Sequence, residues 1–140
     1  MFNKNKKVVR VFLSIPMNGL SKTEIISSLA TAKQQVRAMK IFEDYKIDFL
    51  DGMYKPADML EKMTKMQLSN YQGRLYACAD SIQIMSTCDF VYFGDNYPSA
   101  FGCLLEYRAA VLYMAPVGED EDSRLYHADT EVAWEILGEE

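Results

Sequence analysis

The sequence predicts an α/β fold in which a mostly parallel sheet carries helices on both faces. Segments rich in β-branched residues alternate along the chain with segments whose apolar residues recur at helical spacing, which is the element order of a parallel sheet. Residues 89–94 (DFVYFG) form a near-continuous apolar run, as strands buried on both faces do. The length of 140 residues predicts one domain, 1–140. Right-handed crossovers then place helices on both faces of the sheet.

The first elements follow from turn and capping signals. Residues 8–15 (VVRVFLSI) are rich in β-branched types and end at a turn with Pro, Asn and Gly, which predicts a strand. Residues 21–24 (SKTE) carry the pattern of a capping box and predict a helix start. Apolar residues then recur on one face through residues 25–39. A short second strand is expected at 46–50, closed by an Asp-Gly turn.

The middle of the chain is predicted to be helical. After Pro56, methionines at positions 59, 63 and 66 share a helical face, which indicates core packing. Residues 69–73 (SNYQG) predict a polar break. The next helix is marked by Leu75, Cys78 or Ala79, Ile82 and Met85.

The C-terminal part continues the alternation. The buried strand at 89–94 is followed by a turn and by a helix expected over 100–113. A last short strand is predicted at 115–117, an exposed acidic loop at 118–123, and a final helix over 129–137.

Charge and hydropathy exclude two classes of partner. The net charge of −5 argues against nucleic-acid binding, which is driven by neutralisation of phosphates. No apolar run approaches the roughly 18 residues of a membrane-spanning helix, so we expect no membrane association. The basic start is followed by a short apolar run without a small-residue cleavage pattern, so no signal peptide is expected. The acidic charge balance fits a protein that binds a small molecule.

Cysteine and histidine usage bears on compartment and metals. Cys78, Cys88 and Cys103 are odd in number and form no C-x-x-C pair, which fits a reducing, cytoplasmic compartment. One histidine with scattered cysteines does not make a zinc site, so no metal is expected. His127, the one histidine, lies in a polar stretch and is predicted to be at the surface.

Two loops could hold a ligand, because ligands of open α/β sheets bind beyond the carboxyl ends of the strands. The first is 14–21 (SIPMNGLS), which leads into a helix N-terminus where free N–H groups favour an anion. A plain strand-to-helix turn that caps its helix is the alternative. The second is 95–102 (DNYPSAFG), after the buried strand.

Glu106 is the main candidate for chemistry. It lies about one turn inside the helix that follows the second loop, where the helix dipole favours an ionised carboxylate. A glycosidic nucleophile must be ionised. Glu106 shares a helical face with Cys103 and Ala110, and Gly102 leaves room for a substrate to approach. The alternative is a surface glutamate that only complements the dipole.

Two aspartates are further candidates. Asp80, in the preceding helix, could protonate a leaving group, because acids with separated pKa values divide the catalytic roles. A polar helix face is the alternative for Asp80. Asp95, at the end of the buried strand, is placed for ligand contact.

At these residues the sequence resembles a known family. FLSIPMNGLSKTEI together with SIQIMSTCDFVYFGDNYPSAFGCLLEYRAAVLY is similar to small proteins of the DUF4406 type, a branch of the nucleoside 2-deoxyribosyltransferase-like superfamily. The resemblance implies a flavodoxin-like, three-layer sandwich with a mostly parallel sheet of about five strands. It also implies a homodimer or higher homo-oligomer.

The resemblance further implies the site. Glu106 would be the catalytic nucleophile and Asp80 the assisting acid, while Ser14 and Ser99 would hold a 5′-phosphate. The substrate-binding residues expected from the two loops are Ser14, Pro16, Met17, Asn18, Gly19, Asp95, Ser99 and Gly102. No metal or organic cofactor is expected. The chain departs from the superfamily at Ile15, where many members have Gly, and at Ala100, where many have an acid or Ser.

The expected function is cleavage or transfer at the N-glycosidic bond of a (deoxy)nucleoside or nucleoside 5′-monophosphate, as a hydrolase or a transferase. The alternative is a non-catalytic nucleotide-binding or sensing module of the same fold. A structural protein that binds a partner through the acidic loop 119–122 and the helix with Trp134 is a third possibility.

Overall fold

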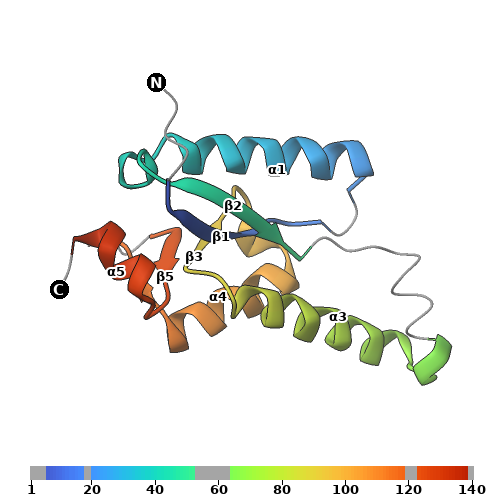
Figure 1. The fold of residues 1–140 in the computed structure, drawn as a ribbon. Helices are drawn as coiled ribbons and strands as arrows, with labels where there is room; N and C mark the ends of the chain where they lie inside the picture. The colour runs from blue at the N-terminus through green and yellow to red at the C-terminus, as the bar shows by residue number, and fades with distance from the viewer. Residues whose placement is uncertain (1–5, 18–19, 53–63, 119–122, 139–140) are drawn as a thin grey trace.

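The fold was analysed in a computed structural model that describes residues 6–17, 20–52, 64–118 and 123–138 (Figure 1). The strands and helices alternate as the sequence predicts. In chain order they are β1 (Val8–Ser14), α1 (Lys22–Arg37), η1 (Lys40–Phe42), β2 (Lys46–Asp51), α3 (Asn70–Met85), β3 (Phe90–Phe93), η2 (Tyr97–Ser99), α4 (Phe101–Tyr113), β4 (Ala115–Pro116), β5 (Leu125–His127) and α5 (Glu131–Leu137). The helix predicted after Pro56 lies largely outside the described residues, although residues 64–66 are helical.

The five strands form one open sheet in the order β2-β1-β3-β5-β4. β1 pairs in parallel with both β2 and β3. β5 pairs antiparallel with β3 and with β4, so the sheet is mixed and the prediction of a mostly parallel sheet is wrong for this half. The physical reason is the short connection between β4 and β5, which reverses the chain as a hairpin does. With only three residues, β5 is too short to show a strand pattern in the sequence.

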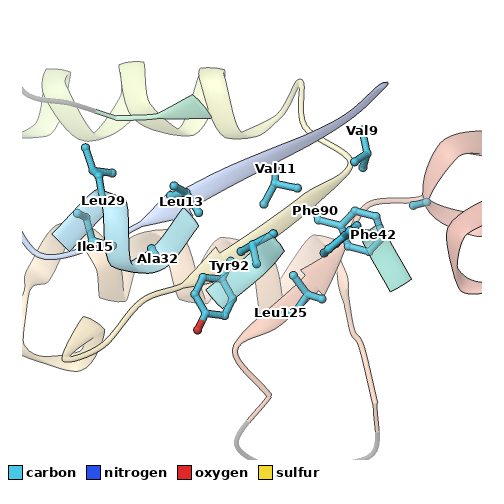
Figure 2. Close-up of a cluster of buried hydrophobic side chains, with 12 residues drawn as sticks. Val9, Val11, Leu13, Ile15, Leu29, Ala32, Phe42, Phe90, Tyr92 and Leu125 are labelled. Atoms are coloured by element: carbon cyan, nitrogen blue, oxygen red, sulfur yellow. The ribbon is translucent and has the colours of Figure 1, made fainter. Parts of the chain in front are cut away.

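Alternating side chains of β1 divide the core between the two faces of the sheet. Val9, Val11 and Leu13 point to the face covered by α1. On that face they pack with residues of α1, β3 and η1, and Figure 2 shows this cluster, which includes Leu29, Ala32, Phe42 and Phe90. Each of the strand residues is at most 1% exposed, so α1 and the sheet exclude water between them.

The opposite face carries α3 and α4 (Figure 1). Phe12, from β1, packs there with Val91 and Phe93 of β3. Met85 at the end of α3 and Ala110 of α4 complete this second cluster. Ser14 has the same strand parity as Phe12, and it therefore lies on the α3 and α4 side at the end of β1.

Capping boxes start both long helices. In α1 the Glu24 N–H donates to Ser21 Oγ and the Ser21 N–H donates to Glu24 Oε1, both at 3.1 Å, as the sequence predicts. Ser69 and Gln72 form the same reciprocal pair at the start of α3. A break does separate residues 64–66 from α3, at residues 67–69. Its predicted extent through residue 73 is wrong, because Ser69 and Gln72 satisfy the free N–H groups of a helix N-terminus.

β1 and β3 end side by side, and their connections leave to opposite faces of the sheet. The Gly94 N–H donates to the Ser14 carbonyl at 2.9 Å. A Cβ on Gly94 would lie 2.6 Å from Ile15 Cγ2, so this contact requires glycine. The two loops predicted to hold a ligand both start at this point, which is the switch in strand order.

His127 is buried, in contrast to the surface position predicted for it. It is the last residue of β5, which lies between β3 and β4, and its ring packs against those of Phe90 and Trp134. Its Nδ1 is 2.9 Å from the Ala128 carbonyl. The histidine is thus part of the packing between the sheet and α5.

Candidate functional site

Glu106 lies in the second turn of α4 and is turned into the protein. Only 8% of its surface is exposed. Cys103 and Ala110, which the sequence places on the same face, are also buried. The predicted buried face of this helix is therefore confirmed, and the alternative of a surface glutamate is excluded.

Two serine hydroxyls bind the carboxylate, one on each oxygen. Ser14 Oγ donates to Glu106 Oε1 at 2.7 Å, and Ser81 Oγ donates to Oε2 at 2.5 Å. Ser14 comes from the end of β1 and Ser81 from α3, so three elements meet at one side chain. Both serines are buried. Each carboxylate oxygen has two lone pairs, so a single donated bond leaves one available for chemistry.

Burial dominates the electrostatics of the site. Loss of water around the carboxylate raises the pKa of Glu106 above its ordinary value of 4.5, while the hydrogen bonds from Ser81 and Ser14 act in the opposite direction. The sequence predicts the reverse direction through the helix dipole. The dipole acts within the first turn, whereas Glu106 lies one turn further along α4, so desolvation has the larger effect.

Two thiols border the carboxylate. Burial raises the pKa of Cys103 to about 11, and the negative charge of Glu106 acts in the same direction. Burial and the same carboxylate also raise the pKa of Cys78. Both groups are therefore neutral thiols near neutral pH, and they add to the apolar surroundings of Glu106.

Ser81, rather than its neighbour Asp80, contacts Glu106. Successive helical residues point about 100° apart, so the two side chains of α3 face different directions. Asp80 is half-buried, and no hydrogen bond joins it to Glu106 in the described part of the chain. The sequence contained a signal for Ser81, since Cys78, Ser81 and Met85 lie on one helical stripe. A hydroxyl on a buried stripe needs a partner. Leu75, expected on the buried face, is exposed.

The first loop is only partly described. Pro16 and Met17 are half-buried, and Met17 packs against the core on the α1 side. The Leu20 N–H donates to the Met17 carbonyl at 3.2 Å, which closes the turn before α1. Asn18 and Gly19 lie outside the described residues.

The second loop directs its polar groups away from Glu106. Ser99 is exposed, and its hydroxyl donates to the Asn96 carbonyl at 2.7 Å within the turn. Asp95 is exposed and accepts a bond of 2.7 Å from Arg124, whose guanidinium lowers the pKa of that carboxyl. The structure therefore does not bring Ser99 or Asp95 into contact with Ser14 and Glu106.

Asp95 instead borders a pocket on the α1 side of the sheet edge. The pocket has a volume of about 220 Å³, and Ile15 lines it from the end of β1. Hydroxyl and amide side chains of α1 form the opposite wall: Ser27, Ser28, Thr31 and Gln35. Ile15 and Ser14 point to opposite faces of the sheet, so this pocket and the Glu106 site lie on different sides.

Gly102 lies next to open space. It precedes Glu106 by one helical turn, and a Cβ on it would meet no atom within 4 Å. Helical side chains lean toward the N-terminus of their helix, so the Glu106 side chain lies over the turn that contains Gly102. Position 102 therefore adds no side chain to this turn of α4.

The described ranges contain no group of three or more His, Cys, Asp or Glu side chains that could hold a metal ion. None of the helices they include is long and apolar enough to cross a membrane.

No protein-family model, curated protein or solved structure matches this chain.

Proposed function

We propose that this protein cleaves or transfers at the N-glycosidic bond of a (deoxy)nucleoside or nucleoside 5′-monophosphate, with Glu106 as the nucleophile. The observation that supports the proposal is the buried carboxylate of Glu106, held by Ser14 and Ser81 at the carboxyl end of β1. The segments that resemble the nucleoside 2-deoxyribosyltransferase-like superfamily supply the substrate class. They include the strand that ends at Ser14 and the helix that carries Glu106.

A carboxylate in this setting is costly to the fold. Burying an acid without a cationic partner destabilises the folded chain, and its two hydrogen bonds compensate only in part. Perturbed titratable groups of this kind concentrate at functional sites. The serines fix the plane of the carboxylate and leave one lone pair on each oxygen, which is what a positioned nucleophile requires.

In the first step, a Glu106 oxygen attacks the anomeric carbon of the sugar. The new C–O bond forms as the C–N bond to the base breaks, and the bonding electron pair leaves with the base nitrogen. The base then takes up a proton, for which Asp80 is the donor that the family resemblance implies. Water or the N–H of a second base then attacks the anomeric carbon, and the C–O bond to Glu106 breaks with its electron pair returning to the carboxylate. Asp80 takes up the proton that the attacking group loses.

Turnover assays with matched variants test this proposal. Purified protein is incubated with deoxynucleosides and their 5′-monophosphates, with and without an acceptor base, and free base is measured by chromatography. Glu106→Ala and Glu106→Gln should abolish base release, whereas Glu43→Gln, an exposed carboxylate, should leave it unchanged. Base release by Glu106→Ala at the wild-type rate would refute the proposed role.

A second candidate is a nucleotide-binding or sensing module without turnover. One observation favours it: a serine, Ser81, contacts Glu106 where a second carboxylate could have provided the acid. In that case no compound releases base, and Glu106→Gln still binds nucleotide with nearly unchanged affinity in a thermal-shift titration.

The third possibility, a partner-binding surface, receives no support from Trp134, whose indole N–H donates to Asp129 and whose ring packs on His127. Residues 119–122 lie outside the described chain.

Three further expectations complete the proposal. The arrangement of helices on both faces of the sheet supports a flavodoxin-like three-layer sandwich. The exposed apolar residues of α4 support a homodimer. The three free cysteines support a reducing, cytoplasmic location.

A further inference from the structure

Gly52 lies directly against Ser81 of α3. Gly52 is the first residue after β2 and is half-buried. A Cβ on Gly52 would lie 2.9 Å from Ser81 Cβ and would overlap the Ser81 hydroxyl oxygen. The ring of Phe12 is at an ordinary contact distance of 3.6 Å from the same point. No side chain therefore fits at position 52 while Ser81 keeps its place.

Space, rather than backbone conformation, requires glycine at this position. The described glycines with positive φ are Gly118 and Gly138, and Gly52 is not among them. An alanine at position 52 could adopt the local backbone without the strain of a left-handed conformation. Its methyl group would be excluded only by Ser81.

The Ser81 side chain cannot move away from a methyl group at position 52 without breaking its hydrogen bond to Glu106. Rotation about χ1 would move the hydroxyl oxygen, and that oxygen makes the 2.5 Å bond to Glu106 Oε2. Rotation would also leave Ser81 Cβ in place, so the 2.9 Å contact would remain. The alternative is a shift of α3 away from β2, which would lengthen the same hydrogen bond.

We propose that Gly52 is a positioning residue, whose missing side chain lets Ser81 reach the Glu106 carboxylate. Gly52 thereby affects the carboxylate of α4 through a side chain of α3. The inference depends on the proposed function for the role of Glu106 as a nucleophile. The contact geometry does not depend on it.

The consequence is a change in the proton affinity of Glu106. A donated hydrogen bond stabilises the ionised form, so loss of the Ser81 bond raises the pKa of Glu106 further. A smaller fraction of the carboxylate is then ionised at a given pH. In an active enzyme, the acid limb of the pH–rate profile would move to higher pH.

Direct titration of Glu106 tests the inference without using turnover. The side-chain carboxyl carbon is followed by ¹³C NMR against pH and assigned with Glu106→Gln. Four variants are compared with the wild type: Gly52→Ala, Ser81→Gly, the double variant, and Ala79→Gly. The last is the control, because it places the same glycine on an exposed position of α3.

We expect Gly52→Ala and Ser81→Gly to raise the titration midpoint by similar amounts, and Ala79→Gly to leave it unchanged. The double variant should rise no further than Ser81→Gly, because both changes remove the same bond. An unchanged midpoint in folded Gly52→Ala, or full additivity in the double variant, would overturn the inference.

Folding itself supplies a second readout. If Gly52→Ala does not fold, Ser81→Gly in the same chain should restore folding, because it removes the side chain that collides. Failure of both chains would show that Gly52 is required for another reason and would overturn the inference. If the wild type releases no base from any nucleoside, the proposed function fails while the titration still decides the role of Gly52.

Discussion

The hydroxyl of Ser14 links a β-strand to a carboxylate 92 positions later in the chain. It is 1% exposed, and Glu106 accepts its hydrogen bond. The Ser81 hydroxyl is also buried and donates to the same carboxylate. The three side chains form a unit in which loss of one leaves polar groups unsatisfied in a buried place.

Replacement of Glu106 by glutamine should stabilise the protein at alkaline pH. The pKa of Glu106 is raised on folding from 4.5, so the folded state holds the proton more tightly than the unfolded chain. The cost of ionisation is absent below the unfolded pKa and appears as pH rises through the folded pKa. Glu106→Gln should therefore gain about 1 kcal/mol over the wild type near pH 8, the size of a typical single substitution.

Thermal unfolding from pH 4 to pH 8 measures this difference. The gain should shrink as pH falls, and Glu43→Gln should show no such trend. A Glu106→Gln difference that stays constant across this range would contradict a buried, ionising carboxylate.

Substitutions of Ser81 and Asp80 should differ in how strongly the fall in turnover depends on the leaving base. Ser81→Ala removes a hydrogen bond to a charged group, worth about 1.5–3 kcal/mol, so turnover should fall roughly 10- to 100-fold for all substrates. Asp80→Asn should reduce turnover most for bases that need protonation to leave. The comparison uses kcat for two nucleosides whose bases differ in basicity. Equal losses for both nucleosides in Asp80→Asn would argue against its role as an acid.

At the scale of the element, helix starts decide where the site residues lie. α3 carries Ser81, and the capping box of Ser69 and Gln72 sets where this helix begins. α4 starts at Phe101 without a side-chain cap, and the extended Ala100 precedes it. The position of Glu106 thus depends on the turn after β3. The position of Ser81 depends on a helix cap whose residues are neighbours in the sequence.

Removal of the α3 cap should lower stability by a defined amount. Ser69→Ala loses the bond from the Gln72 N–H and should cost about 1 kcal/mol of unfolding free energy. Ser69→Asp keeps an acceptor at the N-cap and should stay near the wild type. Urea unfolding of the three proteins measures the effect. A loss in Ser69→Asp equal to that in Ser69→Ala would mean that the cap is not the cause.

For the whole molecule, the unusual feature is the apolar outer surface of α4. Phe101 is 88% exposed and Leu112 is 75% exposed, and Leu105 lies on the same helical face between them. Contiguous exposed apolar surface of this kind marks interaction sites. Its position on the helix that carries Glu106 would place the interface of the proposed homodimer next to the candidate site.

A charge on this face should therefore shift the proposed dimer toward monomer. Light scattering should give the mass of a dimer for the wild type and that of a monomer for Leu112→Glu at the same concentration. Gln34→Glu, an exposed change of the same charge on α1, is the control and should remain dimeric. A monomeric wild type at high concentration would refute the homodimer.

The sequence alone determined the features that depend on neighbours in the chain. The strand predicted at 8–15, the capping box of α1 and the helix predicted over 100–113 follow from periodicity and local hydrogen bonding, and the structure confirms them to within one residue. Burial of Glu106 was one of two alternatives that the sequence left open, and the structure decides between them. Ser14 and Glu106 were both candidates, because Ser14 ends one strand and Glu106 lies in the helix that follows its neighbour. The spacing of apolar residues along the chain is enough to predict features of this kind.

Tertiary structure decided what depends on distant residues. The antiparallel pairing of β5, the burial of His127 and the choice of Ser81 over Asp80 depend on packing against elements far away in the sequence. The pKa direction of Glu106 was also decided there, because desolvation comes from surrounding elements whereas the dipole comes from the helix itself. The same is true of Gly52, whose role depends on its distance from a side chain on another element.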